Sequence, residues 1–142
     1  MKPAQELLDQ LNADRPPVDV ASIASALGLH VKLVHNAQWD CALDVASSTI
    51  FVQNGTLTRV RFAIAHELAH WQLHRSSRSA FRCNFYYEGR LDAHEVQANG
   101  FAVDLLLPSH QVAAYSLYER PEQIAERFQV TVALVEHQLR HG

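Results

Sequence analysis

The stretch TRVRFAIAHELAHWQLH (residues 58–74) contains the pattern HExxH, from His66 to His70. It has no Gly or Pro and repeats apolar residues at helical spacing, which predicts one continuous helix. On a helix, residues four apart lie on one face, so His66 and His70 can reach the same metal ion. Glu67 lies beside the remaining coordination position, where it can accept a proton from an attacking water. The stretch therefore predicts a metal site with a general base.

A catalytic zinc site of this kind has three protein ligands and one open position. A second helical pattern, residues 93–107, offers His94, Glu95 and Asp104 as the third ligand. Glu95 is the best candidate, because Asn99 lies one helical turn further on the same face and can orient a ligand. His74 is rotated off the ligand edge and is expected to have a structural or supporting role.

Composition limits the class of protein. The chain has 142 residues, of which 48% are hydrophobic and 19% charged, as in a soluble globular domain. We expect residues 1–142 to form one domain. A net charge of −3 gives no basic signature for nucleic acid. No apolar run approaches the length of a membrane span, and MKPAQELLDQL lacks the apolar core of a signal peptide, so we expect a cytoplasmic location.

The two cysteines, Cys41 and Cys83, do not form a metal-spaced pair. In a cytosolic protein they are expected to be reduced thiols. A disulfide between them is a less favoured alternative, and a redox-sensing or metal-masking role is less favoured still.

The rest of the chain predicts an α+β fold, with a small, mainly antiparallel sheet and helices packed on one of its faces. Residues 75–92 lack clean periodicity and are expected to form a loop over the metal cleft, with at most a short helical turn. Alternating residues predict strands at 29–35, 41–46 and 49–53. Further helices are predicted at 3–12, 19–26, 109–118, 121–128 and 131–140.

The last two helices, within residues 118–142, have a helix-turn-helix-like pattern. Residues 119–142 carry three Arg against four Glu, which is unfavourable for binding phosphates. Packing onto the rest of the domain, or binding a partner, is therefore favoured over direct binding of nucleic acid.

With these motifs the chain resembles the ImmA/IrrE family, whose members share a zincin-like metallopeptidase domain. The resemblance rests on RFAIAHELAHWQLH (61–74) and EVQANGFAVDLLLP (95–108), with weaker likeness at 16–31, 48–53 and 124–139. It implies a Zn²⁺-dependent endopeptidase in which His66, His70 and Glu95 bind zinc and Glu67 is the general base. It also implies a protein substrate, a helix-turn-helix repressor or antitoxin. One departure is Ala69, where many members have Gly.

Three functions remain open from the residues. A regulatory zinc endopeptidase is preferred, with an extended substrate added along a sheet edge. A non-cleaving binding module of the same fold, docking a repressor or antitoxin, is the main alternative, and a small-molecule zinc hydrolase is a second. In a peptidase, a further hydrogen-bond donor could stabilise the negative charge that develops on the carbonyl oxygen of the substrate. Tyr86, Tyr87 and His94 are the candidates for this donor.

Overall fold

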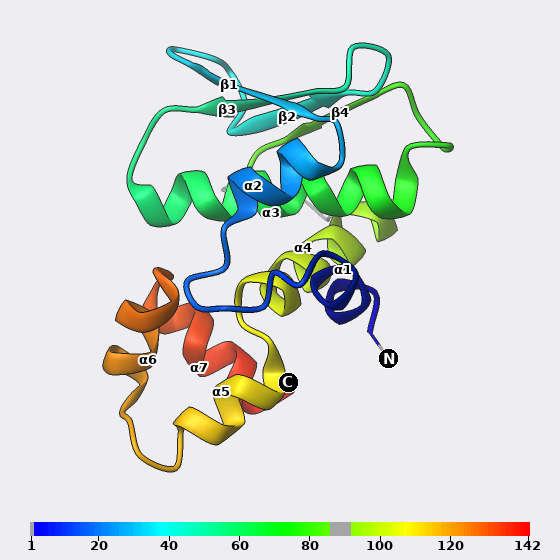
Figure 1. The fold of residues 1–142 in the computed structure, drawn as a ribbon. Coiled ribbons are helices and arrows are strands. Elements are labelled where there is room, and N and C mark those ends of the chain that lie inside the picture. Colours follow the sequence, from blue (N-terminus) through cyan, green and yellow to red (C-terminus); the bar gives the residue numbers. More distant parts are fainter. Residues whose placement is uncertain (1, 86–91) are drawn as a thin grey trace.

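The computed structural model describes residues 2–85 and 92–142 of the chain and has an α+β fold (Figure 1). Within these residues, helices outnumber strands and occupy most of the second half of the chain. The elements are α1 (Pro3–Leu11), α2 (Val20–Ala26), β1 (His30–Val34), β2 (Cys41–Asp44), β3 (Thr49–Gln53), α3 (Leu57–His74), β4 (Ala80–Cys83), α4 (Ala93–Leu106), α5 (Ser109–Tyr115), α6 (Pro121–Phe128) and α7 (Val132–His141).

The described strands form a mixed four-stranded sheet in the order β1-β3-β2-β4. β1 pairs with β3 in parallel, whereas β2 pairs with β3 and with β4 in antiparallel fashion. The predicted mainly antiparallel sheet is therefore confirmed, and the strand predicted at 49–53 has those bounds. The helices lie on one side of this sheet (Figure 1). Ile50 and Val52 of β3 are fully buried, whereas Phe51 between them is only half-buried and packs against Trp39.

The prediction of a loop over residues 75–92 is wrong for one part of that segment. Ala80–Cys83 forms β4, the edge strand next to β2. Phe81 and Cys83 are buried and alternate with exposed Ala80 and Arg82, as expected for a strand with one buried face. Residues 86–91, which include Tyr86 and Tyr87, lie outside the described residues. The correction matters because β4 brings a cysteine to the predicted metal site.

Helix α3 is the central element of the fold. Thr56 caps its N-terminus by accepting a hydrogen bond from the backbone N–H of Arg59, at 3.4 Å. The sheet covers one side of α3 and α4 the opposite side (Figure 1). Every residue from Ala63 to His70 is buried, so this part of α3 is enclosed all round rather than along a single apolar stripe. The HExxH residues therefore lie in the interior of the molecule.

The C-terminal helices α6 and α7 pack onto the rest of the chain. Ile124, Phe128 and Val135 are fully buried in the same hydrophobic core as the sheet and α3. The Gln138 side-chain amide of α7 donates to the backbone carbonyl of Leu107 at 2.7 Å and to Asp104 at 3.0 Å. This agrees with the expected packing of the pair onto the domain. Of the helices in residues 2–85 and 92–142, none is long and apolar enough to cross a membrane.

Candidate metal centre

Three side chains that the sequence predicts as ligands meet between α3 and α4. His66 Nε2 lies 3.0 Å from Glu95 Oε2, and His70 Nε2 lies 3.0 Å from Glu95 Oε1. Asp92 caps α4 by accepting from the backbone N–H of Glu95 at 2.9 Å, which fixes the start of the helix and so the position of Glu95. Both imidazoles are buried, and the Glu95 side chain is 17% exposed.

The orientation of His66 is fixed by Asn99, as the sequence predicts. His66 Nδ1 lies 2.8 Å from Asn99 Oδ1, and because an amide oxygen only accepts hydrogen bonds, Nδ1–H is the donor. Nε2 is then the nitrogen that faces Glu95 and can offer a lone pair to a metal ion.

His70 is oriented in the same way through two further residues. His74 Nε2 lies 2.7 Å from Gln97 Oε1, so His74 donates through Nε2–H and, when neutral, accepts at Nδ1. His70 Nδ1 lies 2.9 Å from His74 Nδ1 and therefore donates to it. This leaves Nε2 of His70 facing Glu95 with a lone pair. The structure thus gives His74 the supporting role expected for it, and adds Gln97, which the sequence analysis missed.

Glu67 carries a polar atom that has no partner. Its side chain is fully buried, and among the described residues Glu67 Oε2 is the buried side-chain oxygen or nitrogen that makes no hydrogen bond. Leaving such an atom unpaired costs about 1–3 kcal/mol. Glu67 Oε1 lies 4.0 Å from His70 Nε2, on the side of the imidazoles that faces the sheet. A buried, unpaired carboxyl oxygen beside two oriented imidazoles fits a group that acts on something bound there.

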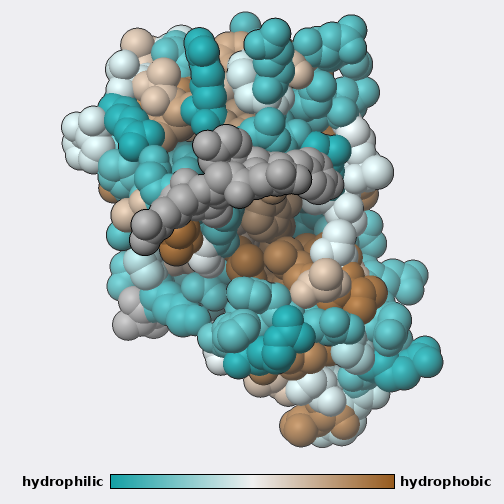
Figure 2. Space-filling view, turned by 180° about the vertical axis from the view of Figure 1, so that it is seen from behind, coloured by the Kyte–Doolittle hydropathy of each residue, from teal (hydrophilic) through white to brown (hydrophobic). Residues whose placement is uncertain are grey.

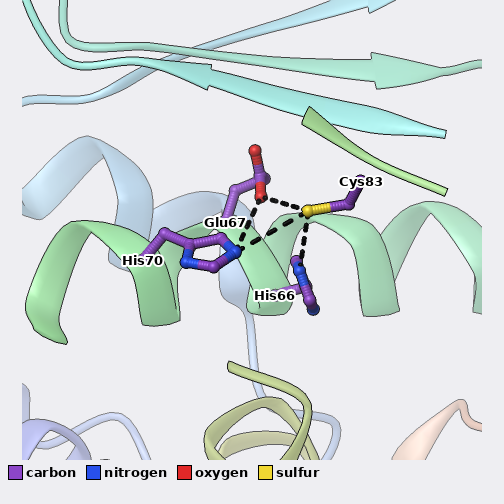
Figure 3. A group of neighbouring side chains, drawn as sticks. All are labelled: His66, Glu67, His70 and Cys83. Carbon is purple, nitrogen blue, oxygen red and sulfur yellow. Dashed lines mark hydrogen bonds and ion pairs between the residues drawn. The ribbon is translucent and has the colours of Figure 1, made fainter. Parts of the chain in front are cut away.

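Cys83 of β4 completes the cluster (Figure 3). Its Sγ lies 2.9 Å from His66 Nε2, 3.7 Å from His70 Nε2, 3.4 Å from Glu95 Oε1 and 3.5 Å from Glu67 Oε1. The ligand atoms of His66, Glu67, His70 and Cys83 all lie within 4.8 Å of one another, so the group could hold a metal ion. Sequence spacing does not reveal Cys83, because it joins the site only through the pairing of β4 with β2.

The charges in the cluster are strongly coupled. Burial opposes the charge of His66, but its hydrogen bonds to Cys83 and Glu95 raise its pKa to about 9. Burial lowers the pKa of His70, and the charge of His66 adds to that effect, although Glu95 opposes it. Although burial raises the pKa of Glu95, its hydrogen bonds to both histidines bring it well below its usual range. Burial raises the pKa of Glu67 well above its usual range, and the charge of Glu95 adds to this. Without a metal, therefore, the surroundings favour the ionised form of Glu95 and the protonated form of Glu67.

A largely apolar groove adjoins the cluster. One cavity of about 250 Å³ includes Phe62, Phe85 and Leu134 in its lining, and a second of about 610 Å³ shares Phe62 and Leu134 and reaches Asn99. The ring of Phe85 lies 5.4 Å and that of Phe62 6.3 Å from the ring of His66, measured between centroids. Hydrophobic surface also gathers in a hollow on the face shown in Figure 2. The groove gives the cluster a neighbouring binding surface.

The other sequence candidates have different positions. His94 is half-buried, and its ring packs against that of His74 at an interplanar angle of 54°, with centroids 4.3 Å apart. Asp104 lies at the far end of α4, where it contacts Lys2 and Gln138, so it is not near the cluster. Tyr86 and Tyr87 are outside the described residues. Glu95 is therefore the one of the three third-ligand candidates on α4 that meets both histidines.

Comparison with known proteins identifies the family. A family model described as the IrrE N-terminal-like domain, a peptidase family, matches residues 24–140. The match covers the sheet, α3, α4 and the C-terminal helices, and it confirms the resemblance drawn from the sequence. No curated protein matches the chain. The chain belongs to the IrrE N-terminal-like domain family, a family of metallopeptidase-type domains.

Proposed function

We propose that this protein is a zinc-dependent endopeptidase in which His66, His70 and Glu95 bind the metal and Glu67 is the general base. The observation that carries the proposal is the orientation of both imidazoles: each donates through Nδ1, so that each Nε2 faces the same carboxylate. Histidine ligands in metal sites are held by hydrogen bonds of this kind at the second ring nitrogen.

The chemistry of the donors fits zinc. Two imidazoles and one carboxylate are the protein ligands of one class of catalytic zinc site. The raised pKa of Glu67 and its unpaired Oε2 also fit this chemistry. The positive charge of a bound metal would stabilise the carboxylate form of Glu67, and an attacking water would give the carboxylate a partner for proton transfer. When bound, zinc would supply Lewis acidity, which activates a water and polarises a peptide carbonyl.

The residues around the metal would transfer protons and hold the ligands in position. Glu67 would accept a proton from the attacking water and pass it to the leaving amine. Asn99 and the His74–Gln97 pair would keep the two imidazoles in place throughout. The enclosed position of α3 would exclude bulk water and strengthen these interactions.

An extended polypeptide is the substrate that suits the surroundings. Among the strands of residues 2–85 and 92–142, β4 lies at the edge of the sheet beside the cluster, and no other of these strands pairs with its outer side, where an added strand could pair. The apolar groove at Phe62 and Phe85 lies next to His66 and suits a large hydrophobic side chain of such a substrate. Within this class we propose a helix-turn-helix repressor or antitoxin and a regulatory role, as the family resemblance implies. The cytoplasmic location that we propose rests instead on the sequence expectation.

The test is cleavage of a purified helix-turn-helix repressor or antitoxin from the same organism, with and without a chelator. We expect a chelator-sensitive fragment. Glu67→Gln should keep one zinc per chain and lower the cleavage rate about 100- to 10,000-fold, the usual contribution of a general base. Glu122→Gln, an exposed change of the same chemistry on α6, is the matched control and should keep full activity. Full activity in Glu67→Gln would falsify this mechanism.

The same experiment separates the alternative function, a non-cleaving binding module. The burial of the cluster and the presence of Cys83 within it are the observations that favour this alternative. A stable complex of the two proteins without fragments, unchanged by Glu67→Gln, would support docking and argue against proteolysis.

A further inference from the structure

The position of Cys83 is not explained by the hydrolytic site as proposed. Around zinc, nitrogen and oxygen ligands lie about 2.0–2.1 Å and thiolates about 2.3 Å from the metal. A tetrahedron with these bond lengths separates a nitrogen or oxygen from the sulfur by about 3.6 Å. Cys83 Sγ lies 3.7 Å from His70 Nε2 and 3.4 Å from Glu95 Oε1, close to this separation. Its distance to His66 Nε2 is 2.9 Å and would need to lengthen by less than about one ångström. The sulfur thus lies at distances from the other three ligand atoms that suit a fourth ligand. Figure 3 shows it beside the two imidazoles.

A second observation concerns the residue opposite Cys83. In the antiparallel pairing of β2 with β4, Cys41 is its direct partner, and the two thiols interact. Opposed residues of antiparallel strands have Cα atoms about 4.5–5.5 Å apart, within the range of about 4.4–6.8 Å that a disulfide spans. Both cysteines are free and buried. Cys83 thus has two alternative partners, the ligand cluster on one side and Cys41 on the other.

We propose that Cys83 is a fourth metal ligand that closes the site, and that formation of a Cys41–Cys83 disulfide removes it and opens the position for substrate and water. This rests on the proposed function, whose regulation it supplies. A structural zinc site has four protein ligands, whereas a catalytic one keeps a position free. With Cys83 bound, no position would remain for the water that Glu67 must deprotonate, and the protein would be latent.

The opening step balances with a peroxide as the oxidant. The Cys41 thiol and the Cys83 thiolate together lose one proton and two electrons and form one S–S bond. Hydrogen peroxide takes up these, with one further proton from solvent, and leaves as two waters. A disulfide sulfur carries no thiolate charge and is a much weaker ligand than the thiolate that it replaces. The Glu95 side chain is 17% exposed, so the cluster is open to a small solute on that side. A dithiol reductant would reverse the step.

Cobalt substitution tests the closed state without reference to proteolysis. We expect Co²⁺ to bind at one ion per chain and to give a thiolate-to-cobalt charge-transfer band in the near ultraviolet. Cys83→Ser should lose that band and still bind cobalt through the other three ligands, whereas Cys41→Ser, the matched control, should keep it. Cobalt bound by the wild-type protein without the band would overturn the proposal, and this result needs no variant to fold.

Peroxide treatment tests the opening step. In the cobalt-loaded wild-type protein we expect loss of the band and a Cys41–Cys83 bridged peptide in mass spectrometry, both reversed by dithiothreitol. In Cys41→Ser no such bridge can form within the chain. Oxidation of Cys83 in the wild-type protein without a bridge to Cys41 would contradict the switch.

The two proposals can fail separately. If neither zinc nor cobalt binds at one ion per chain, the metal site itself is wrong, and so is the proposed hydrolysis. If the metal binds through histidine and carboxylate but shows no thiolate band, only the role of Cys83 is wrong, and the endopeptidase stands.

Discussion

His70 depends on a hydrogen-bond chain through His74 to Gln97, so we expect metal affinity to depend on a residue that does not touch the metal. His74→Phe keeps a ring in the same place but removes the nitrogen that accepts from His70 Nδ1. Loss of such a supporting hydrogen bond typically weakens metal binding about 10- to 100-fold. His94→Phe is the control, because the ring of His94 packs at a tilt against His74, and no hydrogen bond described joins His94 to His66 or His70. Zinc affinity measured by competition with a chromophoric chelator checks both, and equal affinities in the two variants would refute the chain.

Protons and the metal compete for His66. Its pKa of about 9 in the metal-free protein means that the imidazole is protonated at neutral pH, with Glu95 as its counter-ion. A ligand must be deprotonated to bind, so the metal has to displace this proton. We expect the apparent zinc affinity to rise between pH 6.5 and 9 by up to about tenfold per pH unit for each ligand proton that the metal displaces, and the contribution of His66 to end near pH 9. Chelator competition across this range, corrected for the chelator's own protonation, measures the slope, and a flat profile would exclude the raised pKa.

Among the elements, α3 and β4 show why one part of the site could be read from the sequence and another could not. The apolar periodicity of residues 58–74 is long enough to predict α3, which presents His66 and His70 on one face. The helical spacing of Glu95 and Asn99 in the next helix then indicates Glu95 as the third ligand. β4 has only four residues, with Phe81 and Cys83 on its buried face. In a segment that also contains several Ser and Arg, so short an alternation of apolar and polar residues cannot be distinguished from a chance pattern. The approach of Cys83 to His70 follows from strand pairing between distant segments, which no local pattern encodes.

The close packing of α3 on α4 sets the distance across the site. Ala102 lies three residues after Asn99, on the face of α4 that meets α3, and is fully buried. Ala102→Leu would push the helices apart, moving Glu95 and Asn99 away from the two histidines. We expect a loss of stability of about 1–3 kcal/mol together with weaker zinc binding. Ala114→Leu on α5, at an exposed position, should change neither. Urea unfolding and zinc titration of both variants test this, and unaltered zinc affinity in the Ala102→Leu variant would show that the spacing is not critical.

On the scale of the whole molecule, the hydrophobic core runs without a break from α1 through the sheet and α3 to α7. Residues 1–142 are therefore predicted to unfold as one unit, the C-terminal pair at 118–142 included. We expect a single calorimetric transition whose van't Hoff and calorimetric enthalpies agree. An earlier, separate transition that removes only the helices of residues 118–142 would show instead that the pair is an independent unit.

Arg61 of α3 connects distant parts of this core, and its removal should weaken the whole domain. Its guanidinium donates to the backbone carbonyls of Val18, at 2.8 Å, and of Phe128 and Gln129, at 3.1 Å each. It thus joins the segment before α2 to the end of α6. Hydrogen bonds from a charged donor are worth more than neutral ones, and three carbonyls lose theirs together, so Arg61→Met should lower the free energy of unfolding by about 2–3 kcal/mol.

The control for this change is Arg140→Met on α7, an exposed position where we expect a change within about 0.5 kcal/mol. Because Arg61 makes no contact with the ligand cluster in the hydrogen bonds described, the folded Arg61→Met protein should still bind one zinc per chain. The urea midpoint of the metal-free protein and the zinc stoichiometry separate these two effects. A midpoint equal to that of Arg140→Met would mean that the link between the two ends of the chain does not stabilise the fold.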